Sequence, residues 1–593
     1  MINFSTLLGE FKKKLSFFSL LILLTIISVS HLLYVVKTHQ FPANDEHYYI
    51  QYAVDMLPIL KKPSLKMWSQ IMELTRYRQP LYPLFIALPL LIFGTSQAYK
   101  IALILNGVFY LITIVAVYFL SREFFDKKIA FLAAFIFCFN GFSLFYLHFA
   151  YTETAVTAFV SLALLFLKRS ENFSKVKATF LFSVFSTIAI LIRWVAPIFI
   201  FGPFIINLIF SLKNQIDKKT RNIKNFSKNL FAFFIAGILP TLLFYYLPRF
   251  SYFKDYITGN IEYGSIWAVQ LLNNPALKNT WSKPSLIWYG NILAQQTIFF
   301  FILFIIGILI AFKNFKKYKF ILSAIAFPYF VFTLGSAWKD DRFIVTIYPS
   351  MAIACSLTIE VIKKQTIQRV VMTFVIILGF LNFLGASWGI GPMGKEGLKS
   401  IVIPMPIGHP RRIYLSPIVW PPRQNQTNHE QLINTIVKSH DYSSGKKPNV
   451  LMTFDSYYIE GNLYKTARYE QPELFRLVTL FNLDKCKYHT LFHRIKEADY
   501  VLVKTGKFFE KDNENSVDII KVINQVLRFK NAKLPSAFVP IKTIYIPIDK
   551  SNLTIYKRTT EVSSEEIKQM FPFFLKADPS FKNSYDEETS LCI

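Results

Sequence analysis

Long apolar runs separated by short polar connectors fill residues 1–388 of the chain. The first run, Ser16 to Val36, matches the roughly 20 residues that a helix needs to cross the hydrocarbon core of a bilayer. Ten further runs repeat the pattern, so the sequence predicts a polytopic α-helical membrane protein with eleven spans. The later predicted spans are residues 98–120, 129–147, 152–167, 178–192, 195–212, 229–247, 296–312, 320–337, 343–362 and 370–388.

Lysine and arginine gather in every second connector, as at Lys12–Lys14 and in the stretch Lys213–Lys228. Connectors rich in these residues stay on the cytoplasmic side of a membrane. The pattern therefore predicts a cytoplasmic amino terminus and an outer face that holds residues 37–97, residues 248–295 and everything after Trp388. The first span lacks the small-residue cleavage site of a signal peptide, which favours an uncleaved anchor.

One apolar run is predicted to lie along the outer membrane surface. Leu81–Phe93 is too short to span a bilayer and contains Pro83 and Pro89, which favours an interfacial or re-entrant helix. Counting this run as a span would also turn every later basic connector outward.

Residues 389–593 have a different composition, with short alternating elements in place of long apolar runs. Their periodicity predicts a small extracytoplasmic α/β domain. Its predicted elements are strands at Val450–Phe454 and Tyr500–Val503, an amphipathic helix at His489–Glu497, and a hairpin of Thr543–Ile548 with Leu553–Lys557.

Composition supports the membrane interpretation, because 53% of the residues are hydrophobic and 61 are Phe. Much of the net charge of +29 lies in the short connectors, where it sets topology and meets anionic lipid, so we expect no nucleic-acid partner. Four scattered cysteines argue against a disulfide framework or a zinc site. Gly389, Gly391 and Gly394 match a nucleotide-binding glycine pattern, but a membrane helix precedes them where a strand is required, and we assign them no ligand.

The best candidate for chemistry lies just after the first span, in the sequence Asn44-Asp45-Glu46-His47-Tyr48-Tyr49. Two adjacent carboxylates are costly so close to a bilayer, and a carboxylate can serve as a general base. Asn and Asp also cap helices, and Glu is favourable in a first turn, so the same residues are suited to starting an interfacial helix. The two roles are compatible.

Motifs in several outer connectors share one family pattern. After Asp45-Glu46-His47-Tyr48-Tyr49, the chain has Arg78-Gln79-Pro80-Leu81-Tyr82-Pro83 leading into the short apolar helix. Later motifs are Tyr151-Thr152-Glu153, Leu191-Ile192-Arg193, Asp341-Arg342-Phe343 and Tyr348-Pro349. Together they resemble the GT-C glycosyltransferases, in the branch of the protein O-mannosyltransferases, lipid A aminoarabinose transferases and lipopolysaccharide-core transferases. The chain departs from that pattern at Ala43-Asn44, where a proline is usual, and at Phe343, where many members have tyrosine.

The resemblance implies an inverting glycosyltransferase that moves a hexose or pentose from polyprenyl phosphate to a hydroxyl of a glycolipid, glycan or protein at the outer face of the membrane. It implies that Asp45 is the catalytic base, with Glu46 assisting it. Glu153 is the expected second acidic site, either as a substrate contact or as part of a divalent-metal site. The expected phosphate-binding residues are Arg193, Lys339 and Arg342, and the expected substrate-binding residues are Tyr49 and Arg78.

Other interpretations stay open at this point. Arg193 and Arg342 are also suited to snorkelling at helix ends, and Glu153 to capping its helix. His47 and His148 lie near the carboxylates but lack the fixed spacing of metal ligands. For the whole chain, the alternatives are a transporter or lipid flippase, although its sequence shows no inverted repeat, and a receptor-like protein whose tail does the work.

Overall fold

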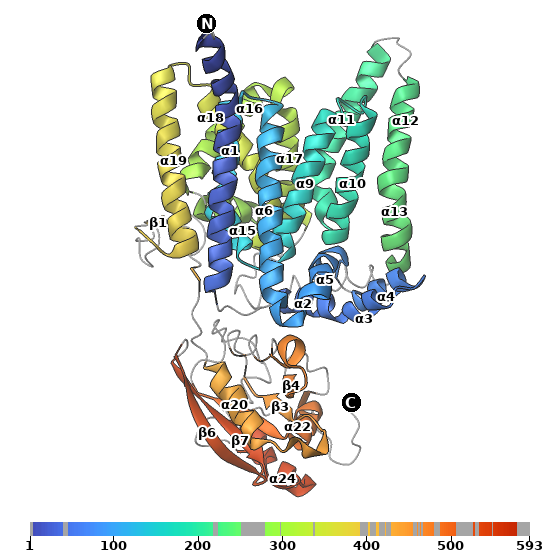
Figure 1. Cartoon of the computed structure of the whole chain (residues 1–593), viewed down its shortest axis with the longest axis vertical. Helices are drawn as coiled ribbons and strands as arrows, with labels where there is room; N and C mark the ends of the chain where they lie inside the picture. The colour runs from blue at the N-terminus through green and yellow to red at the C-terminus, as the bar shows by residue number, and fades with distance from the viewer. Residues whose placement is uncertain are drawn as a thin grey trace. The chain divides into compact units, whose positions relative to one another are not determined.

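The computed structural model describes residues 4–38, 45–76, 78–217, 223–250, 279–296, 298–335, 339–391, 401–403, 411–413, 421–422, 428–454, 459, 463, 466–479, 487–505, 526–527, 533–547 and 550–577. The chain forms two compact units. The first comprises Met1–Thr38, Tyr52–Ile92 and Tyr99–Pro422, and the second His39–Gln51, Phe93–Ala98 and Arg423–Ile593. The first is helical and the second contains the larger sheet (Figure 1).

Seven of the described helical segments are long and apolar enough to cross a membrane. They are Phe18–Lys37, Thr95–Arg122, Ala196–Lys213, Ser227–Tyr246, Phe315–Gly335, Asp341–Glu360 and Gln365–Trp388. An eighth span results if α7 (Lys127–Cys138) and α8 (Gly141–Leu147), which meet at 60°, count as one broken helix. The chain is therefore an integral membrane protein, and the predicted number of eleven spans is not confirmed.

Three predicted spans fall outside that set for visible reasons. α10 (Val176–Ile192) and α16 (Ile298–Lys313) have 17 and 16 residues. α9 (Thr152–Arg169) carries one acidic residue in its first turn and two basic residues in its last. All three nevertheless pack inside the bundle, α10 against α9 and α16 against α18 (Tyr348–Glu360).

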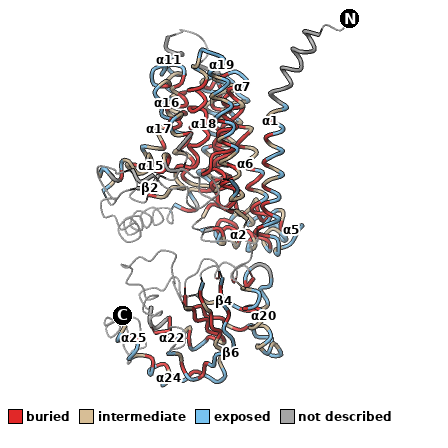
Figure 2. Tube along the Cα trace, turned by 90° about the vertical axis from the view of Figure 1, so that its left-hand side faces the viewer, coloured by how far each residue is buried: buried red, intermediate tan, exposed pale blue. Residues whose placement is uncertain are grey.

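α18 lies inside the bundle and α1 (Phe4–Lys37) at its edge (Figure 2), while α19 (Gln365–Trp388) is an outermost helix in Figure 1. In the segment Asp341–Glu360, 89% of the most apolar stretch is buried, against 33% in each edge helix. The sequence of α18 explains this position, because it is rich in Ala and Ser, which let neighbouring backbones approach. α16 uses this space, since a Cβ added at Gly307 would collide with the Ala354 carbonyl.

The remaining elements of the first unit include the other membrane helices, short helices that connect them and a small sheet. α5 (Leu81–Phe93) is a helix over the predicted residues and contains Pro89. The other helices are α2 (Asp45–Asp55), which the unit boundary divides after Gln51, α3 (Leu57–Lys61), α4 (Met67–Leu74), α6 (Ala98–Arg122), α11 (Ala196–Asp217), α12 (Ile223–Phe233), α13 (Leu239–Thr241), α15 (Lys283–Gln296) and α17 (Phe315–Gly335). Short helical segments are η2 (Phe234–Ile238), η3 (Leu242–Tyr246), η4 (Leu247–Arg249) and η6 (Asp341–Ile347), and a two-stranded sheet pairs β1 (Ile401–Ile403) with β2 (Arg411–Ile413).

Arg249 ties the surface helices to the bundle. Its buried guanidinium donates hydrogen bonds to the backbone carbonyls of Met72, Thr75 and Arg78, each at 2.9 Å, and to the Thr75 hydroxyl at 2.8 Å. A buried guanidinium needs such partners, so this residue fixes the connector between α4 and α5. Most of the predicted outer segment 248–295 lies outside the described residues.

The second unit is a five-stranded sheet with the order β4-β3-β5-β7-β6. β3 (Asn449–Met452), β4 (Arg476–Thr479) and β5 (Tyr500–Lys504) are parallel, and β6 (Phe538–Ile546) and β7 (Ser551–Arg558) form an antiparallel hairpin. One face packs on α22 (Lys487–Glu497), α24 (Ser564–Lys568) and α25 (Phe571–Ala577), and the other on α20 (His429–Ser439). The predicted strands, helix and hairpin are therefore confirmed, and η1 (Thr95–Gln97), η7 (Tyr442–Ser444) and η8 (Thr466–Glu470) complete the unit.

Gly389 has an ordinary structural use. It ends α19 in a left-handed conformation with φ of 66°, and its amide binds the Gly385 carbonyl at 3.0 Å. This is the common glycine cap of a helix, and it explains the residue without a nucleotide.

Candidate active site

Charged residues from three parts of the first unit gather at one end of the membrane bundle. Glu153 lies in the first turn of α9, and Arg193 ends α10. Arg193 Nη1 lies 2.5 Å from Glu153 Oε1, and both side chains are largely buried, with 14% and 3% of their surfaces exposed. The structure therefore joins two residues that the sequence treated as separate sites.

A second ion pair lies in the connector that leads from α17 into η6. Arg342 donates through Nε and Nη2 to Asp340 Oδ2, at 2.9 and 2.7 Å, and its backbone amide binds Asp340 Oδ1 at 2.9 Å. Burial alone would raise the pKa of the Asp340 carboxyl, but the Arg342 charge and its hydrogen bonds hold that pKa below its usual value. Asp340 therefore stays ionised at neutral pH and fixes the orientation of the guanidinium.

Two cation–π contacts lock these pairs together. The Arg193 guanidinium carbon lies 5.8 Å from the centre of the Phe343 ring, and that of Arg342 lies 5.6 Å from the centre of the Tyr151 ring. Phe343 follows Arg342 in sequence, and Tyr151 stands two residues before Glu153, so each arginine rests on the segment that carries the other pair. Mutual support of this kind restricts the rotamers of both arginines.

Lys339 is the third cation of the cluster. Its ammonium is fully buried and donates to the backbone carbonyls of Phe332 and Thr333, at 3.1 and 2.5 Å, in the last turn of α17. The centre of the Tyr289 ring lies 5.8 Å away. Burial lowers the pKa of Lys339 to about 8, so the side chain is mostly charged at pH 7.

Sequence reasoning missed two residues of this cluster. Asp340 holds the Arg342 guanidinium, but the predicted motif begins one residue later, at Asp341. An Asp at this position is a typical helix N-cap, and Asp340 is the N-cap of η6. Tyr146 donates its hydroxyl to Asp341 Oδ1 at 3.4 Å. Nothing in its sequence context marks Tyr146 as part of a site.

The other predicted site residues come from different segments of the chain. Asp45 and Glu46 are the first two residues of α2, and the Glu46 and Tyr49 side chains are buried, while Asn44 lies outside the described residues. Asp45, Glu46 and Tyr49 belong to the second compact unit, and their catalytic and substrate-binding roles stay predictions. Arg78 is half-buried in the connector between α4 and α5, where its carbonyl accepts the bond from Arg249.

The metal interpretation gains no support from the described part of the chain. No three His, Cys, Asp or Glu side chains among those residues are grouped to hold a metal ion. Glu153 is engaged by Arg193 instead. His148 stacks on Tyr34 with ring centres 3.6 Å apart and contacts the Ser387 hydroxyl at 3.1 Å, so its ring is used in packing.

An apolar groove of about 700 Å³ runs between α11 and α17. It is lined from Ser323 to Gly335 on α17, which is a length of about 18 Å at 1.5 Å per residue. Its last lining residues, Leu334 and Gly335, directly follow the Thr333 carbonyl that Lys339 binds. The groove therefore ends beside the cationic cluster.

The chain is similar to proteins of known family and structure. Residues 78–252 match the family model described as dolichyl-phosphate-mannose-protein mannosyltransferase. ArnT from Cupriavidus metallidurans bound to undecaprenyl phosphate superposes with a TM-score of 0.50 at 9% sequence identity, over 90% of this chain and 97% of ArnT. The apo form of ArnT gives 0.51 over the same shares at the same identity. This is the GT-C fold.

The Archaeoglobus fulgidus oligosaccharyltransferase in its apo form matches more distantly, with a TM-score of 0.49 and 12% identity over 93% of this chain and 75% of that protein. No curated protein sequence matches the chain. The resemblance read from the motifs is confirmed, and the family model together with the GT-C fold supports a glycosyltransferase. The identity of the sugar and the stereochemical course belong to the proposal below.

Proposed function

We propose that the chain is an inverting glycosyltransferase that moves a hexose or pentose from polyprenyl phosphate to a hydroxyl of a glycolipid, glycan or protein. The observation that carries this proposal is the cluster of Arg193, Lys339 and Arg342 at one end of a GT-C bundle, next to an apolar groove. A lipid-linked phosphate needs both features, because its chain is apolar and its head is anionic.

In the proposed reaction, the acceptor hydroxyl attacks the anomeric carbon from the face opposite the phosphate. Asp45 accepts the hydroxyl proton as the new C–O bond forms, and the bond from the anomeric carbon to the phosphate oxygen breaks. Polyprenyl phosphate leaves with the electron pair. Cations placed where this charge develops lower the barrier, since they stabilise the departing phosphate, which gains a second negative charge, more than the singly charged phosphodiester of the donor.

The contacts of the cluster support a division of roles. Asp340 preorganises the Arg342 guanidinium, whose planar donors match phosphate oxygens. Glu153 neutralises much of the Arg193 charge, so we propose that it positions Arg193 rather than contacting substrate. The groove between α11 and α17 takes the first isoprene units of the donor. The structurally similar ArnT was solved bound to undecaprenyl phosphate.

For the whole chain we propose that residues 1–388 form the catalytic membrane region and residues 389–593 an extracytoplasmic domain. The end of the bundle opposite the cluster carries the basic connectors, for example Arg122 after α6 and Lys313 after α16. That distribution supports a cytoplasmic amino terminus and an active site at the outer face.

The testing experiment incubates purified full-length protein with a panel of polyprenyl-phosphate sugars and measures free polyprenyl phosphate. We expect release from one donor class, and a large loss of release in Arg342→Ala. Arg369→Ala, which removes an exposed arginine of α19, is the matched control and should keep wild-type release. Donor that crosses a vesicle membrane without release of phosphate would support a flippase and reject the proposal.

A further inference from the structure

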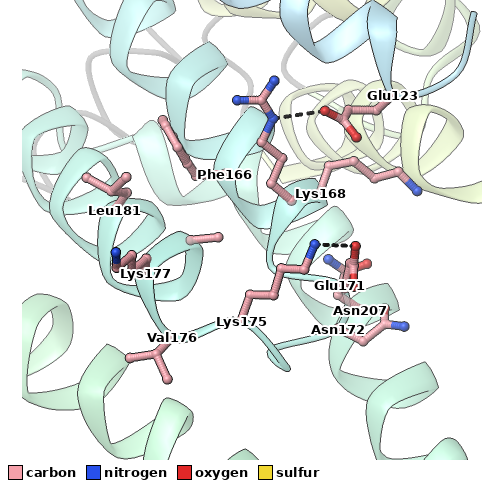
Figure 3. A pocket seen from close by; sticks show the side chains of 12 residues that line it. Glu123, Phe166, Lys168, Glu171, Asn172, Lys175, Val176, Lys177, Leu181 and Asn207 are labelled. Carbon is pink, nitrogen blue, oxygen red and sulfur yellow. Dashed lines mark hydrogen bonds and ion pairs between the residues drawn. The ribbon is translucent and has the colours of Figure 1, made fainter.

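A cavity of about 900 Å³ is lined by residues from the last turn of α9 and the first turn of α10 (Figure 3). It lies at the end of α9 opposite the Glu153–Arg193 pair. α9 reaches both places, with Glu153 in its first turn and Lys168 and Arg169 in its last. At 1.5 Å per residue these ends are about 24 Å apart. The proposed glycosyl transfer therefore does not explain this cavity.

The lining of the cavity has more positive than negative charge. Its four cations are Lys168, Arg169, Lys175 and Lys177, and its two carboxylates are Glu123 and Glu171. Both carboxylates are already in ion pairs, with Arg169 at 2.9 Å and with Lys175 at 2.6 Å (Figure 3). The charges of Lys168 and Lys177 are therefore in excess.

A neighbouring lysine increases the excess of positive charge at the cavity. Lys319 precedes Phe320 near the start of α17, and the Phe320 ring centre lies 6.0 Å from the Lys168 ammonium, so Lys319 adds a cation close to the cavity. Lys168 rests on the Phe124 ring, with its ammonium 5.0 Å from the ring centre, which holds its charge near the cavity wall. Several cations kept together without matching acids produce a positive potential that favours an anion.

The ion pairs of the rim do not prevent an anion from entering. The Lys175 and Glu171 side chains are 58% and 62% exposed, and exposed pairs of this kind contribute only about 0–1 kcal/mol. A phosphate can therefore exchange with these carboxylates at little cost. The first turn of α10 lines the same cavity, and its N-cap residue, Lys175, makes no capping bond through its side chain.

The opposite wall of the cavity is apolar. Phe166 and Leu181 point into it from α9 and α10 (Figure 3). Phe180, which does not line the cavity, is 48% exposed on α10, as expected of a side chain that faces lipid. The site thus joins a charged rim to an apolar wall beside the membrane.

We propose that this cavity binds the phosphate of an anionic phospholipid, whose acyl chains lie against the outer surface of α10. Lys168, Lys175 and Lys177 contact the phosphate, and the apolar wall contacts the glycerol and the first methylene groups. A lipid fits better than a free anion because the cavity has the volume of a drug-sized ligand site and adjoins the lipid-facing surface. Basic pockets between helices at a membrane face are suited to such headgroups.

The test uses the full-length protein in mixed micelles of phosphatidylglycerol and phosphatidylcholine with identical acyl chains, and counts retained lipids by native mass spectrometry. Wild type should retain phosphatidylglycerol in preference. Lys168→Gln with Lys177→Gln should weaken that retention roughly 30-fold, about fivefold for each lysine. Lys127→Gln with Lys128→Gln changes the charge equally at exposed positions outside the cavity and should leave retention unchanged.

Single Lys177→Gln keeps the test decisive if the double variant fails to fold, because Lys177 is exposed. Wild-type retention in that variant would overturn the proposal, as would an equal loss in the control pair. In a further arm, excess inorganic phosphate should displace little phosphatidylglycerol. Full displacement would show a free-anion site and reject the lipid.

Discussion

Arg193 and Glu153 form a nearly buried ion pair, with 2.5 Å between Nη1 and Oε1, although 40 positions separate them in sequence. The pair joins the start of α9 to the end of α10 at the end of the bundle where Arg342 also lies. The two residues therefore act as one unit, because each charge is balanced by the other.

A double-mutant cycle measures this coupling. Arg193→Met leaves the Glu153 carboxylate buried without its partner, so unfolding free energy in detergent should fall by roughly 3–5 kcal/mol. Glu153→Gln in the same chain should recover most of the loss, since it removes the stranded charge. Lys175→Met breaks an exposed pair and should change stability by less than about 1 kcal/mol. Additive single effects would mean that the two side chains do not interact.

Arg342→Lys tests whether the planar guanidinium matters. A lysine can keep the ion pair with Asp340 but cannot present two parallel donors to a phosphate. Turnover should therefore fall roughly 10- to 100-fold, the cost of one or two charge-assisted hydrogen bonds, with thermal stability unchanged. Arg369→Lys is the control. Wild-type turnover in the Arg342 variant would remove this residue from the site.

The pKa of Lys339 predicts that turnover falls and protein stability rises as pH increases above 8. Burial lowers it from 10.5 to about 8, so the native state loses its proton as pH rises through 8 while the unfolded state keeps its own until about 10.5. Turnover should fall above pH 8 if the charge holds phosphate. In the same window this group should make the protein more stable, because the unfolded state binds more protons. Lys339→Met should remove both trends, and a pH profile unchanged in that variant would assign the trends to another group.

Much of the fold follows from the sequence, while the site follows only in part. The α5 helix, the edges of β5 and the final hairpin could be predicted because their signals are local periods and turn residues. The bond between Arg193 and Glu153 could not, since nothing in either segment indicates which helix ends meet. Asp340 could not be singled out for a similar reason. A capping carboxylate two residues before an arginine is a common local pattern, and its bonds to the Arg342 guanidinium are visible only in three dimensions.

The number of membrane spans is also difficult to derive from hydropathy alone. α9 is packed in the bundle although charged residues stand at both of its ends, and the charge at its start, Glu153, is paired with Arg193. A charged residue of this kind lowers the hydropathy of the segment, so the segment no longer qualifies as a span. A functional membrane helix retains it because its partner is supplied by another helix.

Single cysteines test the proposed orientation. In a background without the four native cysteines, Cys at Ser64 or Ser444 should react with an impermeant thiol reagent in intact cells. Cys at Ser174 or Asn314 should react only after permeabilisation. All four positions are exposed, so burial does not explain a difference. The reverse pattern would place the basic connectors outside and the proposed active site inside.

The most direct test of the central claim is the turnover of Asp45→Asn with the donor from the polyprenyl-phosphate panel that wild-type protein uses. Asparagine caps a helix as well as aspartate does but cannot accept the acceptor proton, so turnover should fall by something like 10²- to 10⁴-fold while donor lipid still binds and the protein stays folded. Glu46→Gln should cost less. If Asp45 only starts α2, the asparagine variant will transfer sugar at the wild-type rate, and that result would contradict its assignment as the general base.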